Sequence, residues 1–239
     1  MIDGIVFNGR SAGEFGVVVE RYPAQNAPKR KRKAVSIPGR NGALHYDEGA
    51  WENVPVKYQV YFRGDLPTPE QAHTVKGWLM SPKGYCRLED KYDQGHFRMA
   101  SFAGPLNIEN LLNLYGRCDI SFDCDPRCFR KDGEQLMSFG APGSLYNQTG
   151  FDATPLVYVY GNGAGNISIG GVNVKILNMT TGLALDCESM NAYALGDVAD
   201  SRNGDIYAPE FPVLKPGDNT ITWSGGVTAV KVIPRWWEL

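Results

Sequence analysis

Apolar and polar side chains alternate with a period of two between residues 56 and 62. This period, with β-branched and aromatic side chains on one face, is typical of a strand that covers a core. The alternation returns between residues 118 and 125, where one face is apolar and the other is mostly acidic. The sequence therefore predicts two amphipathic strands, with inward positions at Val56, Tyr58, Val60, Phe62, Cys118, Ile120, Phe122 and Cys124.

The pattern changes to helical spacing after the first of these strands. Thr68 can cap a helix, Pro69 suits the first helical position, and Gln71 lies where a capping-box partner belongs. A proline and a glycine at residues 82–84 are stop signals. We expect one helix over about 68–81, with an apolar face made of Ala72, Val75, Trp78 and Leu79.

Glycine-bearing sequence without sustained periodicity occupies the middle of the chain, between about residues 131 and 154. Such a stretch indicates a domain boundary, and we place the domains at 1–135 and 136–239. The second part has short strand-like runs bounded by Gly, Asn, Asp or Pro and no convincing helix. These runs are Pro155–Tyr160, Asn166–Leu177, Leu183–Glu188, Asn219–Trp223 and Thr228–Ile233.

The composition supports a β-rich chain, with 28 glycines, 15 prolines and 11% aromatic residues, as short strands and tight turns require. The predicted fold class is all-β with one helix. The first domain is expected to be a β-sandwich or barrel-like body that carries the helix. The second is expected to be a β-sandwich of about a hundred residues.

Charge and cysteine content limit the classes of function. With 24 basic and 26 acidic side chains the formal net charge is −2, so the chain as a whole does not attract nucleic acid or anionic lipid. No leader-like start and no apolar run of about 18 residues occur, so we expect no signal peptide, no membrane insertion and synthesis in a cytosol. Five cysteines indicate reduced core thiols. The sequons at Asn147, Asn166 and Asn178 are then not expected to be used.

A run of five cations, KRKRK at residues 29–33, is the one strong local charge signal. Five cations can bind phosphate backbones, but no aromatic side chains are interleaved with them for base stacking. Pro28 and the small polar residues before it predict a mobile surface loop. A solvated or partner-contacting loop is favoured over nucleic-acid binding.

Candidate metal and thiol sites are weak. His45, His73 and His96 are scattered, and none has a second ligand at metal-like spacing. Cys118, Cys124 and Cys128 cluster without a Cys-x-x-Cys pattern, which favours core thiols. No metal or cofactor is predicted.

Candidate catalytic groups are equally weak. The pairs Asp123 with Asp125 and Asp186 with Glu188 could form a glycosidase-like or cation site, but acidic neighbours on an exposed strand face commonly do neither. Gly-x-Ser-x-Gly is absent. The glycines of GNGAGNISIGG lie between strands and are interpreted as a hairpin rather than a phosphate-binding loop.

Several landmarks in the sequence come in a characteristic order. The first half has FNG after an initial strand and a Pro-Gly-Arg-Asn-Gly turn, followed by strand, helix and strand. The second half has Thr154-Pro155, Gly161-Asn162-Gly163, FPVLKPGDNTITWSG and a terminal IPRWWEL. Over nearly the whole chain this order resembles the distal tail protein, or Dit, family of phages with long non-contractile tails.

The resemblance implies a structural protein of the virion tail tip, made in the host bacterial cytoplasm, and no enzyme. Six copies would form a ring through their first domains and join the tail tube to the tip or baseplate. DNA would pass through the central channel without specific binding. The second domain would be galectin-like and would dock tail-tip or receptor-binding proteins.

Four residues are candidates for a ring or partner interface under this interpretation: Arg40, Asn41, Trp51 and Trp237. Arg40 and Asn41 would hold a turn, and adjacent Trp236 and Trp237 would face opposite ways in an extended segment. Two alternatives stay open. A carbohydrate-binding module would lose glycan binding when an aromatic residue is replaced by Ala. A cell-wall-degrading enzyme would lose turnover in Asp123→Asn or Glu188→Gln.

Overall fold

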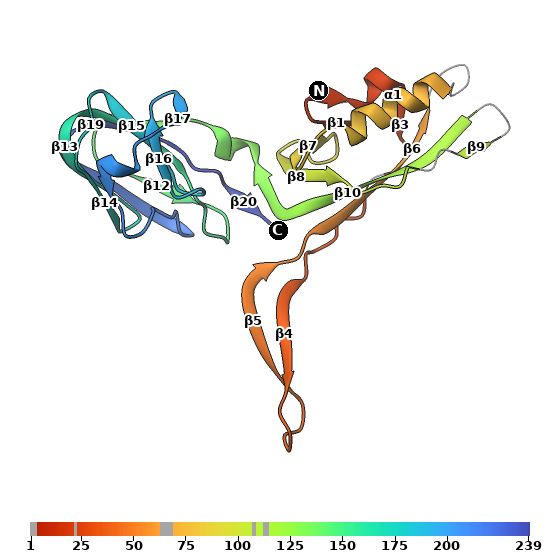
Figure 1. Ribbon diagram of the computed structural model, residues 1–239, viewed down its shortest axis with the longest axis horizontal. Helices are drawn as coiled ribbons and strands as arrows, with labels where there is room; N and C mark the ends of the chain where they lie inside the picture. The colour runs from red at the N-terminus through yellow and green to blue at the C-terminus, as the bar shows by residue number, and fades with distance from the viewer. Residues whose placement is uncertain (1–3, 22, 63–68, 107–108, 112–114) are drawn as a thin grey trace. The chain divides into compact units, whose positions relative to one another are not determined.

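The computed structural model describes residues 4–21, 23–62, 69–106, 109–111 and 115–239 (Figure 1). The described part is mainly β-strand with a single α-helix, which confirms the all-β class with one helix. The chain divides into two compact units. Unit 1 is Met1–Cys128 with Leu239, and unit 2 is Phe129–Glu238.

Unit 1 is built on one strongly curved sheet. Its strand order is β2-β1-β7-β8-β10-β6-β3, and β9 pairs with β10. The strands are β1 (Ile5–Phe7), β2 (Arg10–Ser11), β3 (Val17–Val19), β6 (Val54–Phe62), β7 (Cys86–Asp90), β8 (His96–Phe102), β9 (Glu109–Leu111) and β10 (Tyr115–Arg130). A short 3-10 helix, η1 (Ala12–Phe15), follows β2.

The two strands with a period of two, β6 and β10, pair with each other. They are antiparallel, and cross-strand partners such as Tyr58 with Ile120 and Val56 with Phe122 lie on the same face. That face is buried in the core of unit 1, as the alternation predicts, and the opposite face carries polar side chains.

Helix α1 (Pro69–Met80) packs on this core through its predicted apolar face. The indole of Trp78 stacks on Phe15 with ring centroids 4.7 Å apart, and its Nε1 donates to the Phe7 carbonyl oxygen at 3.1 Å. Gln71 donates to the Phe15 carbonyl oxygen at 2.9 Å, which ties the helix to η1. The predicted cap at Thr68 lies outside the described residues.

A separate two-stranded sheet, β4 (Arg30–Ser36) with β5 (Ala43–Trp51), makes up the rest of unit 1 (Figure 1). The prediction of a loop for residues 29–33 is therefore wrong, because residues 30–33 belong to β4. Backbone pairing with β5 holds them extended, although the strand buries none of its side chains.

Unit 2 is a β-sandwich organised by two long strands, β13 (Leu156–Ile169) and β19 (Gly217–Ile233). The two strands pair with each other. The first half of β13 also pairs with β15, and the sheet continues from β15 through β16 to β17. The second half of β13 pairs with β14, which in turn pairs with β18. The remaining strands of the sandwich are β11 (Met137–Phe139), β12 (Gly143–Asn147), β14 (Val172–Ile176), β15 (Gly182–Asp186), β16 (Asn191–Ala194), β17 (Asp197–Ser201) and β18 (Ile206–Tyr207). The last strand, β20 (Trp237–Glu238), pairs with β10. Two 3-10 helices complete the unit, η2 (Lys131–Glu134) and η3 (Asn203–Asp205).

The hairpin predicted for GNGAGNISIGG is found at its end, where Gly170 and Gly171 form the turn between β13 and β14, whereas the first glycines, GNGAG, lie inside β13. These first glycines form an irregularity with register shifts in the antiparallel pairing of β13 with β19. A Cβ on Gly161 would collide with the carbonyl group of Gly226, and a Cβ on Gly226 with that of Asn162. Glycine is required because the two backbones touch.

Candidate functional site

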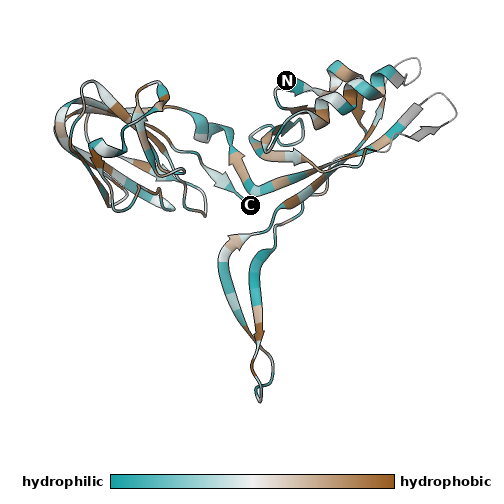
Figure 2. Ribbon diagram, in the orientation of Figure 1, coloured by the Kyte–Doolittle hydropathy of each residue, from teal (hydrophilic) through white to brown (hydrophobic). Residues whose placement is uncertain are grey.

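The β4–β5 hairpin is the most exposed feature of the described chain. We call residues 29–52 the arm. Every side chain of β4 and most of those of β5 are exposed, and none of the described core residues lies between Val19 and Val54. Figure 2 shows mostly hydrophilic residues along β4 and a hydrophobic stretch at its end. A surface this extended can bind a macromolecule but cannot enclose a small substrate.

The tip of the arm holds Arg40 and Asn41, as the Pro-Gly sequence predicts. The Arg40 amide donates to the Ile37 carbonyl oxygen at 3.2 Å, which closes a four-residue turn with Pro38 at its second position. Gly39 at the third position has a φ of 79°, a conformation that favours glycine. Both Arg40 and Asn41 are exposed.

The base of the arm holds Trp51 in a cluster of polar contacts. The guanidinium of Arg30 lies 4.5 Å from the centroid of the Trp51 ring and donates to Asp47 at 3.0 Å. Asp47 also accepts a hydrogen bond from the Gly49 amide at 2.9 Å. This backbone hydrogen bond, with a contribution from the charge of Arg30, holds the pKa of Asp47 below its usual value, although burial opposes it.

Backbone and side-chain contacts join the arm to the sheet of unit 1. The Glu52 amide donates to the Lys29 carbonyl oxygen at 2.8 Å, which closes the base of the hairpin. The next residue, Asn53, donates to the Tyr85 hydroxyl at 2.5 Å and to Asp123 at 2.6 Å. These contacts fix the base of the arm immediately before β6 begins.

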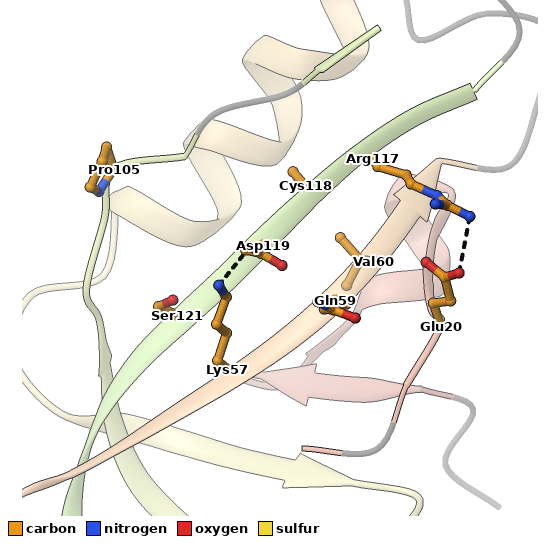
Figure 3. Close-up of a pocket in the computed structure, with 9 residues that line it drawn as sticks. All are labelled: Glu20, Lys57, Gln59, Val60, Pro105, Arg117, Cys118, Asp119 and Ser121. Atoms are coloured by element: carbon orange, nitrogen blue, oxygen red, sulfur yellow. Dashed lines mark hydrogen bonds and ion pairs between the residues drawn. The ribbon is translucent and has the colours of Figure 1, made fainter. Parts of the chain in front are cut away.

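The polar face of β6 and β10 forms a groove with a volume of about 420 Å³ (Figure 3). Two ion pairs occupy it, Lys57 with Asp119 at 2.7 Å and Arg117 with Glu20 at 3.0 Å. Its lining residues are Glu20, Lys57, Gln59, Val60, Pro105, Arg117, Cys118, Asp119 and Ser121. Because the cations and carboxylates pair with each other, the groove offers a screened polar surface.

The Cys118 thiol lies on the core side of β10 and does not have the properties of a nucleophile. Burial, with a further contribution from the Asp119 carboxylate, raises the pKa of Cys118 to about 12. The thiolate that nucleophilic catalysis requires is therefore scarce at neutral pH.

The two candidate carboxylate pairs are engaged in structural contacts. Asp123 accepts from Asn53, and Asp125 forms a bidentate pair with Arg127 at 3.0 Å. Asp186 lies 2.6 Å from Nη1 of Arg235, and Glu188 lies 3.6 Å from the same atom. Burial raises the pKa of Asp186, but the hydrogen bond and charge of Arg235 outweigh this and keep it below the usual value. An acid this strong is unsuited to donate a proton near neutral pH.

The three histidines lie on three different elements. His45 lies on the arm and His73 on α1, both exposed, whereas His96 on β8 has its Nδ1 2.6 Å from Asp93. Within the described residues, no group of three or more His, Cys, Asp or Glu side chains is arranged to hold a metal ion. No helix in that part of the chain is long and apolar enough to cross a membrane.

The fourth candidate, Trp237, makes its contacts within unit 2. Its ring stacks on Phe151 with centroids 4.5 Å apart, and its Nε1 donates to the Asp152 carbonyl oxygen at 2.9 Å. Trp236 is buried in the core of unit 2. The structure thus brings Arg40, Asn41 and Trp51 onto one hairpin and places Trp237 in another unit. Val35, Leu44 and Tyr46 are exposed apolar residues that the sequence pattern does not single out, because their alternation is short and lies beside the charge run.

No family model matches the sequence, and no curated protein matches it. Among solved structures, the fold matches SPP1 Dit (gp 19.1), described as a paradigm of the hub adsorption apparatus in phages that infect Gram-positive bacteria. The TM-score is 0.77, and the match covers 100% of both chains. This chain has the distal tail protein fold. Only 10% of residues are identical, so the likeness predicted from the order of sequence landmarks is confirmed for the fold.

Proposed function

We propose that the chain is a structural protein of a phage tail, located at the tail tip. Six copies form a ring through unit 1 and join the tail tube to the tip or baseplate, and DNA passes through the central channel. Unit 2 lies at the periphery and docks tail-tip or receptor-binding proteins. The observation that carries this proposal is the fold match to SPP1 Dit over the full length of both chains.

Two features of the chain support a structural role. The four carboxylates considered for catalysis are held in hydrogen bonds or ion pairs, as a scaffold requires. The arm exposes a long surface with no core of its own, which is typical of a segment that contacts another macromolecule. Arg40, Asn41 and Trp51 are proposed to act in assembly through this arm, and Trp237 is proposed as a contact of unit 2.

Negative-stain imaging of the purified protein, combined with its mass in solution, tests the proposal. We expect a six-fold annulus and a mass of six or twelve chains. A compact monomer at every concentration would contradict it.

A carbohydrate-binding module is the alternative function. Tyr146 and Tyr207 are exposed aromatic residues of unit 2. If the protein binds glycans, and if this binding is lost when either tyrosine is replaced by Ala, the alternative is favoured.

A further inference from the structure

The arm sorts its side chains into two different faces. In the pairing of β4 with β5, Lys33 is opposite Tyr46 and Val35 is opposite Leu44. Because directly opposed residues share a face, these four side chains form one surface, which we call the apolar face. The other face carries the pairs Arg32 with Asp47, Ala34 with His45 and Ser36 with Ala43.

The polar side of the arm has partners within the arm itself. Asp47 lies 3.0 Å from Arg30 and 4.0 Å from Arg32, and Arg30 also covers the Trp51 ring. The apolar face is different, because Val35 is 41% exposed, Leu44 is 48% exposed and Tyr46 is 64% exposed. In the part of the chain that the structure describes, nothing buries these three side chains.

An isolated two-stranded sheet is marginally stable at best in water. Covering three large side chains on one face would provide the missing hydrophobic contact. Lys33 lies on this face, and Lys31 falls on it by the alternation of β4. The surface that covers the apolar face should therefore combine apolar groups with negative charge.

The distribution of charge along the chain points to the partner. Residues 29–52 contain six basic and three acidic side chains, a net charge of +3. The whole chain carries −2, so the remainder carries −5. A second copy of this chain thus offers the arm an attractive charge, and a repeated arm-to-body contact between copies is heterologous, the type that can close a ring.

We propose that the apolar face of the arm, Val35, Leu44 and Tyr46 with Lys31 and Lys33 beside it, docks on a second copy of this chain. The proposal rests on the proposed ring and names the surface that holds it together. Nucleic acid is the weaker occupant, because phosphate contacts use cations and leave three apolar side chains in water.

Paired substitutions on neighbouring residues of β5 separate the two faces. Leu44→Ser with Tyr46→Ser removes the apolar face, and we expect the concentration needed for assembly to rise at least about 100-fold. Ala43→Ser with His45→Ser changes the opposite face of the same strand and should assemble as the wild type does. Circular dichroism checks that both variants are folded. Lys31→Glu with Lys33→Glu should also weaken assembly, by an amount that falls as salt is added.

The outcomes distinguish this proposal from the proposed function. A wild-type protein that never assembles contradicts the ring itself. Intact rings of the Leu44→Ser, Tyr46→Ser variant overturn the docking of the arm and leave the ring standing. Weaker assembly of this variant alone, with normal assembly of the Ala43→Ser, His45→Ser control, supports the docking.

Photo-crosslinking identifies the occupant directly. A benzoyl-phenylalanine at position 46 of the purified protein should give adducts of two copies, and the same group at position 45 should give far fewer. Equal yields at the two positions would overturn the proposal. So would rings in which position 46 crosslinks to added duplex DNA and not to protein, since the arm would then bind nucleic acid.

Discussion

Nη1 of Arg235 lies 2.6 Å from Oδ1 of Asp186, which joins the end of the chain in unit 2 to strand β15. The Arg235 amide donates to the Gly133 carbonyl oxygen at 2.8 Å, and the next residue, Trp236, is buried. The Pro-Arg-Trp ending is therefore a structural clasp. A carboxylate that could be considered for catalysis is used to close the domain.

Loss of this ion pair should destabilise unit 2. The side chains of Arg235 and Asp186 are only 25% and 19% exposed, so Asp186→Asn should lower the free energy of unfolding by about 2 kcal/mol. Asp200 and Arg202 form a matched control, because they are also 2.6 Å apart but more than 40% exposed. Asp200→Asn should cost much less, because solvent screens an exposed pair. Urea denaturation measures both, and equal losses would contradict the structural role of the clasp.

The same ion pair predicts a direction of pH dependence. The folded-state pKa of Asp186 lies below the ordinary value of 3.8, so its contribution is complete above that pH. The contribution is lost as the pH falls through the lower, folded-state pKa. The difference in unfolding free energy between wild type and Asp186→Asn should therefore be constant near neutral pH and shrink below about pH 4. If the difference in unfolding free energy instead grows as the pH falls, the pKa of Asp186 in the folded protein is not lowered.

The sequence predicts those elements whose side-chain pattern reflects a core. Strands β6 and β10 and helix α1 each bury one face, so their periods of 2 and 3.6 are visible in the residues themselves. The overall fold is predicted from the resemblance of the sequence landmarks to distal tail proteins. One of these landmarks, Phe-Pro-x-Leu-x-Pro-Gly-x-Asn, has a physical reason. The side chain of its Asn219 is buried and forms hydrogen bonds to the backbone of Lys215 and Gly217, which holds the turn.

Other features depend on contacts between distant residues and leave no local pattern. Residues 30–33 belong to a strand that buries none of its side chains, so no alternation of apolar and polar residues marks it as a strand. The run of charges instead suggests a loop, and the pairing with β5 is not visible in the sequence. Gly161 suggests a turn, but it is required because the backbones of β13 and β19 touch at a shift of register there. Likewise, Asp186 and Glu188 look free until Arg235, far away in the sequence, is placed beside them.

Asn219 in the Phe-Pro-x-Leu-x-Pro-Gly-x-Asn segment should be sensitive to an almost isosteric change. It is 2% exposed, and its Nδ2 donates to the carbonyl oxygens of Lys215 at 2.8 Å and Gly217 at 3.0 Å. Asn219→Ala should cost about 2–3 kcal/mol through unpaired buried groups. Asn219→Asp should cost more, because a carboxylate would then face carbonyl oxygens. Thermal unfolding, with the exposed Asn173→Ala as control, measures this; an Asp variant as stable as wild type would refute it.

The thiols should differ sharply in reactivity. Burial is the largest effect on Cys118, Cys124 and Cys187, and it raises the pKa of each to about 12. Cys128 is also buried, whereas Cys86 is partly exposed. Iodoacetamide at about pH 8 should label Cys86 alone in the folded protein and all five cysteines after denaturation. Mass spectrometry gives the count, and Cys86→Ser should leave the folded protein unlabelled.

Removal of the arm should change assembly without changing the stability of the separate chain. A variant in which residues 31–50 are replaced by two glycines keeps the described cores, because none of their residues lies in the arm. At dilutions where both proteins are monomers, the unfolding free energies should agree within about 1 kcal/mol. At higher concentration the wild-type melting temperature should rise with protein concentration, since a partner that binds only the folded state stabilises it, whereas that of the variant should stay constant. A concentration-dependent melting temperature in the armless variant would show that the copies associate through another surface.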